Sequence, residues 1–440
     1  MSETNTAVEV ENKNETKLAP QVLKVPESSI VLAELKKNPT ELSIINLVQA
    51  MILEAYEMRA SDIHMDPSEE EFVIRFRIDG VLYDVYSFPK EIQSEVIARI
   101  KVLSGLRTDE HQMAQDGRLR LSTNNKDKPD EFIDVRVSIA PTFYDENCVL
   151  RLLGDKYSHF TLDKMGFSKS DLEKIERAKD KSYGMILAVG PTGAGKTTTL
   201  YAILKELNSR EVSIVTVEDP VEYSIAGIDQ IPVNERTGMT FAHGLRFILR
   251  QDPDVIMIGE IRDDETAGIA VNAALTGHKV LSTLHANDVA TALPRLLDMK
   301  IEPFLITSTV NLLMSQRLVR TICEECKIPR TLTELEIKSL GFVLNESTIQ
   351  KLLKNDKKEI SVGKGCKACD FTGYHGRINI VEVMEMNNEI RELIMKRANS
   401  KEIKDAAIKN GMTTMHEDGI DKVLNGTTTL EEVLRVFQEE

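Results

Sequence analysis

The glycine-rich run GPTGAGKT, residues 190–197, limits what this chain can fold into more than any other segment. An apolar run at 185–189 precedes it, and a helix-forming stretch at 198–204 follows it. A strand, a tight loop and a helix in this order surround one point with backbone N–H groups and the positive end of the helix dipole. The segment therefore predicts an α/β domain that binds a nucleoside triphosphate.

Nine consecutive residues form the predicted nucleotide-binding loop, and two of them have specific tasks. Lys196 is expected to reach the β- and γ-phosphates of ATP, and the Thr197 hydroxyl is expected to bind Mg²⁺. The alternative is a glycine-rich turn that matches by chance, which the flanking strand and helix disfavour. The loop residues are Gly190, Pro191, Thr192, Gly193, Ala194, Gly195, Lys196, Thr197 and Thr198.

Residues 156–320 contain short, nearly continuous apolar runs that alternate with helical segments. Strands that are buried on both faces have this pattern, so it predicts a parallel sheet with helices on both sides. Glu218, Glu260 and His285 each end or follow one of these runs. Acidic groups at the carboxyl ends of parallel strands lie near the ligand crevice, which makes these side chains candidates for catalysis.

Each of these candidates has an alternative role. We expect Glu260 to position the attacking water and Glu218 to enter the metal shell, and the two roles could be exchanged. His285 is a candidate for contact with the γ-phosphate. For either glutamate the alternative is a surface salt bridge, and for His285 it is a structural role. His278, which precedes the same predicted strand, is expected to be structural.

Residues 41–155 predict a smaller α+β domain. Apolar residues recur at helical spacing between 44 and 55. The alternating runs FVIRFRI and VLYDVY flank Asp79-Gly80, which is a strong hairpin signal, and DVRVSIA predicts another strand. Residues 1–40 lack hydrophobic periodicity and predict a flexible tail.

Four of the five cysteines form two C-x-x-C pairs, Cys323 with Cys326 and Cys366 with Cys369. Each pair can offer two thiolates to a tetrahedral metal, so together they predict a closed, structural Zn²⁺ site. The alternatives are disulfides, which a cytoplasmic location disfavours, and a redox pair, which two matched pairs disfavour. Cys148 stands alone in a strand-like run and is expected to be a small core residue.

Location and partners are limited by composition. The 440-residue chain has no apolar run of about 18 residues and no secretory signal at its N-terminus, which predicts a cytoplasmic protein. A nucleic-acid translocase would need basic stripes or pore loops rich in aromatics. The formal net charge of −15 and the 5% aromatic content speak against this class, so no direct nucleic-acid partner is expected.

An ordered set of motifs resembles one known family. The motifs are ASDIHMDP, GPTGAGKTTT, VEDPVEY, ILRQDPDVIMIGEIRD, LTGHKVLSTLHAND, the paired C-x-x-C and the closing MHEDGIDKVLNGTTTLEEVLRV. Over residues 41–440 this set looks like the secretion ATPases, and more narrowly like the type II secretion and type IV pilus assembly ATPases.

The resemblance implies a division into five parts. A flexible tail (1–40) would precede a PAS-like α+β domain (41–155) and a RecA-like P-loop ATPase core (156–320). A tetracysteine zinc subdomain (321–380) and a helical C-terminal region (381–440) would follow.

The resemblance also implies a homo-hexameric motor on the cytoplasmic side of the inner membrane, held there by a platform protein. ATP-driven closure between the two larger domains would turn or lift the platform, so that pilins or pseudopilins join a filament. In the family, arginines of the N-terminal domain reach the nucleotide on closure, and the matching positions look like Arg136 and Arg151. The alternative is that both arginines lie on a solvated strand face.

Two features bear on which member of the family this is. Many assembly ATPases carry a further folded domain ahead of the position that matches residue 41, and the polar residues 1–40 predict none. Pilus retraction ATPases also lack that domain, which makes retraction the second hypothesis. Retraction motors resemble this chain without the four cysteines, however, so the cysteines favour assembly or secretion. Pilus, pseudopilus and competence motors share the motifs, and the choice among them stays open.

Overall fold

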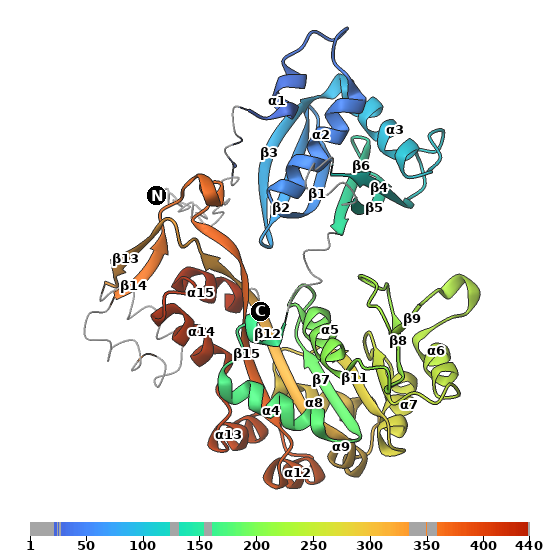
Figure 1. Ribbon diagram of the computed structural model, residues 1–440, viewed down its shortest axis with the longest axis vertical. Helices are drawn as coiled ribbons and strands as arrows, with labels where there is room; N and C mark the ends of the chain where they lie inside the picture. Colours follow the sequence, from blue (N-terminus) through green and yellow to red (C-terminus); the bar gives the residue numbers. More distant parts are fainter. Residues whose placement is uncertain are drawn as a thin grey trace, which may run out of the picture. The chain divides into compact units, whose positions relative to one another are not determined.

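Two compact units make up the chain in the computed structural model (Figure 1). The first comprises Met1–Leu119 and Arg136–Arg151, and the second comprises Arg120–Val135 and Leu152–Glu440. The structure describes residues 22–23, 25, 28–123, 132–153, 161–333, 349 and 359–438. The five-part division expected from the sequence stays a prediction.

Six strands form the sheet of the first unit, in the order β3-β2-β1-β6-β5-β4. The predicted hairpin is confirmed: Ile78 pairs with Val81, and Asp79 and Gly80 have φ values of 50° and 90°, as a two-residue turn of this kind requires. Cys148 is fully buried, as expected of a core residue. The strands are β1 (Ala60–Pro67), β2 (Glu71–Ile78), β3 (Val81–Pro89), β4 (Gln115–Ser122), β5 (Phe132–Pro141) and β6 (Glu146–Leu153).

Helices α1 (Ile30–Leu35), α2 (Ile44–Glu57) and α3 (Gln93–Leu103) accompany this sheet. The prediction of a flexible tail is wrong for the residues of α1. The Ser29 hydroxyl caps that helix by accepting from the backbone N–H of Leu32, and the Glu54 carboxylate accepts from Ile30 N at 2.7 Å. Residues 1–21 of the expected tail lie outside the described residues.

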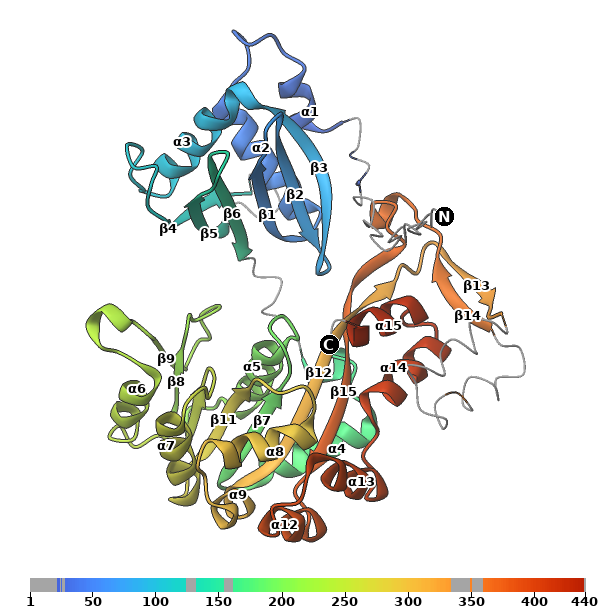
Figure 2. The same ribbon diagram turned by 180° about the vertical axis from the view of Figure 1, so that it is seen from behind.

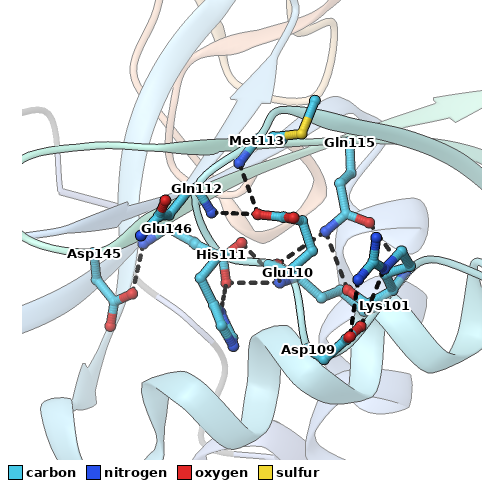
Figure 3. A network of polar contacts seen from close by, with 10 residues as sticks. Lys101, Asp109, Glu110, His111, Gln112, Met113, Gln115, Asp145 and Glu146 are labelled. Atoms are coloured by element: carbon cyan, nitrogen blue, oxygen red, sulfur yellow. Dashed lines mark hydrogen bonds and ion pairs between the residues drawn. The ribbon is translucent and has the colours of Figure 1, made fainter.

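A buried ion pair fixes the segment between α3 and β4 (Figure 3). The Lys101 ammonium is fully buried, lies 2.7 Å from Glu146 Oε1 and donates to the carbonyl of Glu110 at 2.6 Å. His111 Nδ1 lies 2.8 Å from the other oxygen of Glu146. Because a buried charge without its partner is costly, this pair ties the segment firmly to β6.

The second unit contains a seven-stranded sheet with the order β15-β12-β7-β11-β10-β8-β9. All neighbours pair in parallel except β12 and β15, which pair antiparallel. The predicted parallel sheet is therefore present, and the four apolar runs of the sequence form β7, β8, β10 and β11. The strands are β7 (Gly184–Val189), β8 (Ile214–Glu218), β9 (Asp229–Pro232), β10 (Val255–Ile258), β11 (Lys279–Leu284), β12 (Val310–Ile322) and β15 (Tyr374–Glu385).

Helices cover both faces of this sheet (Figure 2). One face packs against α4 (Lys169–Asp180) and α5 (Lys196–Leu207), where Ile186 and Met257 join the helix residues Ile175 and Leu200. Alternate strand residues such as Leu187 point to the other face. The helices there are α6 (Phe241–Ile248), α7 (Asp264–Leu275), α8 (Val289–Asp298), α9 (Pro303–Thr309), α12 (Asn388–Met395) and α13 (Ser400–Lys409).

The remaining elements lie at the β12–β15 end of the sheet, where Met415 and Val436 of the last two helices pack against Val319 and Ile380. Strands β13 (Lys327–Thr331) and β14 (Glu359–Gly363) pair with each other, and helices α14 (Met415–Leu424) and α15 (Leu430–Gln438) close the chain. The chain therefore ends in helices, although the first five residues of the expected helical region, 381–385, belong to β15, and the bounds 381–440 stay a prediction. In the described part of the chain, no helix has the length and apolar character needed to cross a bilayer.

Candidate functional site

The predicted phosphate loop joins β7 to α5, as its sequence requires. Gly190, Gly193 and Gly195 have φ values of 140°, 81° and 84°, which residues with a Cβ rarely adopt. The helix begins at Lys196, two residues earlier than its sequence pattern indicates. The Lys196 ammonium is buried and donates to the carbonyls of Gly190 at 2.7 Å and Pro191 at 2.8 Å. The Lys196 side chain therefore folds back over the phosphate loop, in which it is expected to contact the bound phosphates.

The electrostatic surroundings of Lys196 include one anion and one other cation. Burial lowers the pKa of its ammonium, the Glu260 carboxylate opposes this effect and the Arg317 guanidinium adds to it. The net result is a pKa of about 8. A lysine this far below its ordinary pKa is typical of a functional site.

Glu260 lies in the loop that follows β10, and an arginine and a histidine hold its carboxylate. Arg262 Nη2 lies 2.5 Å from Oε1, and His285 Nε2 lies 3.0 Å from Oε2. His285 directly follows β11, the neighbouring strand. The structure thus brings Lys196, Glu260 and His285 together at the carboxyl edge of the sheet, where ligands of doubly wound sheets bind.

Glu218 ends β8 and is buried in a network of its own. Its carboxylate accepts hydrogen bonds from the hydroxyls of Tyr201 and Thr216, the latter at 2.5 Å. The Gln230 amide donates to it at 3.2 Å. These contacts link β8 to α5 and β9. The expected role of Glu218 in the metal shell stays a prediction, and there it would compete with this network.

Arg136 and Arg151 lie in the first unit, on β5 and β6. Asp62, which is opposite Arg151 in the pairing of β1 with β6, accepts from its Nε at 2.9 Å. Arg77 Nε lies 3.7 Å from the other oxygen of Asp62. The aspartate of the ASDIHMDP motif therefore orients Arg151.

His278, in the second unit, has a structural contact, since its Nδ1 lies 2.9 Å from the carbonyl oxygen of Ala273.

The four cysteines of the C-x-x-C pairs meet in one cluster, with all four sulfur atoms within 4.8 Å of one another. The sulfurs of Cys323 and Cys366, of Cys326 and Cys369, and of Cys366 and Cys369 are each 3.8 Å apart. A tetrahedral site with Zn–S bonds of about 2.3 Å separates its sulfurs by about 3.8 Å. Disulfides, with an S–S distance near 2.05 Å, do not fit these separations.

The backbone around the cysteines supports the same reading. Gly365 N donates to Cys326 Sγ at 3.3 Å, and Gly373 N donates to Cys369 Sγ at 3.3 Å. A Cβ on Gly363 would lie 1.9 Å from the carbonyl oxygen of Gly373, so this approach of two backbones needs glycine. The donor set and its spacing fit Zn²⁺.

Sequence reasoning missed two residues of the site, Gln316 and Arg317. Both belong to β12 and are buried. Gln316 Nε2 donates to the carbonyl of Ala194 at 2.7 Å, inside the phosphate loop. The one signal for them is that polar side chains interrupt the apolar run VNLLMSQRLV.

Comparison with known proteins assigns the chain to a family. A family model described as type II/IV secretion system protein matches residues 38–435. The chain is 42% identical over 402 residues to a type IV pilus assembly ATPase PilB of Myxococcus xanthus, covering 91% of this chain and 69% of the relative. It is 45% identical over 397 residues to a type II secretion system protein E of Aeromonas hydrophila, covering 90% and 76%.

Solved structures share the fold. The ATPase DotB of Legionella pneumophila aligns with a TM-score of 0.63 and 21% identity, over 92% of this chain and 99% of that chain. The pilus retraction motor PilT with bound ADP aligns with a TM-score of 0.56 and 24% identity, over 88% and 95%. At these identities the likeness concerns the fold alone.

Proposed function

The chain belongs to the type II/IV secretion system protein family, and from this premise we propose that it is an ATP-hydrolysing motor for a type IV pilus or a type II secretion pseudopilus. Six copies form a ring in the cytoplasm that works on an inner-membrane platform protein. Pilins or pseudopilins are moved indirectly, and attachment to the membrane is peripheral, through these partners. No nucleic acid takes part.

The observation that carries the proposal is the meeting of Lys196, Glu260 and His285 at one edge of the parallel sheet. Lys196 binds the β- and γ-phosphates of ATP. Glu260, fixed by Arg262 and His285, orients the attacking water, and His285 contacts the γ-phosphate. These groups supply positioning and charge stabilisation, which dominate catalysis of phosphoryl transfer.

Mg²⁺ would be held by the Thr197 hydroxyl, and Glu218 is the candidate for the metal shell. Thr197 lies in the first turn of α5 beside Lys196, so a hard oxygen donor stands at the mouth of the phosphate loop. The ion would neutralise phosphate charge. Zn²⁺ would be held by Cys323, Cys326, Cys366 and Cys369, where it stabilises the local fold and takes no part in hydrolysis.

Coupling to movement is proposed to run through the arginines of the first unit. When that unit closes on the ATPase unit, Arg136 and Arg151 offset γ-phosphate charge, so hydrolysis is tied to closure. The hydrogen bond from Arg151 to Asp62 supports this role, because it holds the guanidinium in a defined orientation. The four cysteines favour assembly over retraction.

The first experiment concerns the phosphate loop. Lys196→Ala should reduce ATP turnover about 100-fold or more, because it removes a preorganised charge from the phosphates. Lys205→Ala, on the same helix, is the matched control, since Lys205 contacts Tyr223 instead. Undiminished turnover of the Lys196 variant would count against an ATPase of this type.

The second experiment identifies the machine. A strain that lacks the gene should lose either surface pili or secretion of exported proteins, and the wild-type gene should restore what is lost. The Lys196→Ala gene should not. A strain that keeps its pili and its secretion, or that becomes hyperpiliated as a retraction mutant would, contradicts the proposed function.

A further inference from the structure

Strand β12 extends beyond its neighbour β7 and continues beside the phosphate loop. The pairing of the two strands ends at Ser315 opposite Val189, whereas β12 continues to Ile322. Both views show β12 running between β7 and β15 (Figure 1, Figure 2). After Ser315, β12 therefore keeps β15 as its neighbour on one side, while on the side of β7 the phosphate loop takes the place of a paired strand.

Gln316, the first of these residues, connects two parts of the phosphate site. Its Nε2 donates to the carbonyl of Ala194, and its Oε1 accepts from the Thr199 hydroxyl at 2.9 Å. The side chain is fully buried, so both bonds are shielded from water. The end of the loop and the first turn of α5 are thereby held against β12.

Arg317, the next residue, lies between the phosphate loop and the loop that follows β11. Its Nη1 is 3.3 Å from the position that a Cβ on Gly190 would take, and it donates to Gln316 O at 3.3 Å. Its Nη2 donates to the carbonyl of Asn287 at 3.2 Å. Asn287 is two residues from His285, the histidine that holds Glu260.

The charge of Arg317 also acts on the phosphate site. Arg317 is buried, with 6% of the residue exposed, and its guanidinium is one of the two charged groups that act on the pKa of Lys196. Two buried cations near one loop repel each other, and a polyphosphate bound in that loop relieves the repulsion. Arg317 can therefore serve the site both through its charge and through its hydrogen-bonding fork.

We propose that Arg317 is a positioning residue for the reaction, holding the His285–Asn287 loop in register with the phosphate loop and adding a second cation to the field that attracts polyphosphate. The inference rests on the proposed function. Its charge contributes to nucleotide affinity, and its fork, by fixing the His285 loop, contributes to turnover.

Two substitutions separate these contributions. Arg317→Gln removes the charge and the fork, so the Kd for ADP should rise about tenfold and kcat should fall. Arg317→Lys keeps the charge but not the planar fork, so the Kd for ADP should stay within about threefold while kcat falls about tenfold. The readouts are ADP binding by calorimetry and steady-state ATP hydrolysis with Mg²⁺.

Controls distinguish this inference from its premise. Arg177→Gln, which breaks an exposed ion pair with Glu385 in the same unit, should change neither readout. If Lys196→Ala abolishes hydrolysis but both Arg317 variants match the wild type, this inference fails and the proposed function stands. Equal losses of affinity in both variants, with lowered melting temperatures, would make Arg317 purely structural and also overturn it. If Arg317→Gln does not fold, Arg317→Lys alone tests the inference, which requires that its Kd for ADP stays within about threefold while its kcat falls about tenfold.

Discussion

At the scale of single residues, the chemical properties of a candidate side chain depend on its burial and on its polar partners. Lys196 matches the phosphate-loop motif by sequence, but its pKa of about 8 comes from burial and from the balance between Glu260 and Arg317. Glu218 and Glu260 both end or follow apolar strands, and yet hydroxyls and an amide hold the first carboxylate, whereas an arginine and a histidine hold the second. Each difference leads to a measurement.

The depressed pKa of Lys196 predicts a pH dependence of nucleotide affinity. The ammonium attracts phosphate below pH 8 and loses its proton as pH rises through that value, whereas bound phosphate favours the protonated form. The affinity for ADP should therefore be full at pH 7 and fall by up to about tenfold per pH unit above 8. Calorimetric titrations at pH 7, 8 and 9 measure this.

The control for this titration is Lys196→Arg, whose guanidinium stays protonated throughout the range. It should bind ADP more weakly than the wild type but with an affinity that does not change from pH 7 to pH 9. A wild-type affinity equally flat over this range would show that Lys196 is not titrating there.

The network around Glu218 gives a second residue-scale prediction. Tyr201→Phe removes one hydroxyl donor and should lower the free energy of unfolding by about 1–3 kcal/mol, with kcat within about threefold of the wild type.

Glu218→Gln should raise the Mg²⁺ concentration needed for half-maximal ATPase activity. An unchanged Mg²⁺ requirement in the Glu218 variant would assign this carboxylate to the network alone.

At the scale of elements, the sequence predicts best where burial is uniform. Strands β7, β8, β10 and β11 are covered on both faces, so each has a short, nearly continuous apolar sequence. Strand β12 is different, because its middle part lies beside the phosphate loop and carries the polar residues Gln316 and Arg317. Its antiparallel partner β15 is far away in sequence, and no local pattern specifies that pairing.

The cysteine cluster leads to a prediction for the elements around it. Purified protein should contain about one Zn²⁺ per chain, and Cys366→Ser should lose the metal and lower the melting temperature, because structural zinc contributes directly to folding. Cys148→Ala changes the one cysteine outside the cluster and should retain the metal. Wild-type protein without zinc by metal analysis would refute the assignment.

At the scale of the whole molecule, the α/β class followed from patterns in the sequence, whereas the expected five-part division stays a prediction. The helix formed by Ile30–Leu35 did not follow from such patterns, because besides its local Ser29 cap it uses a long-range contact, in which Glu54 of the next helix accepts from the backbone N–H of Ile30. The residues of the candidate site likewise include some that local sequence patterns predict and some that they do not. Lys196, Glu260 and His285 are marked by strand ends, whereas Arg317 is part of the site through the long-range placement of β12.

The antiparallel pair of β12 and β15 has a mechanical consequence. The strand that carries Arg317 reaches Cys323 six residues later, and its partner returns from the segment just after Cys369. At about 3.3 Å per residue, the two locations are about 20 Å apart along one hydrogen-bonded ribbon. One continuous ladder of backbone hydrogen bonds therefore connects the phosphate loop, at Gln316, with the cysteine cluster. Under the proposed function, a displacement of β12 at the phosphate loop would be transmitted along this ladder to the cysteine cluster.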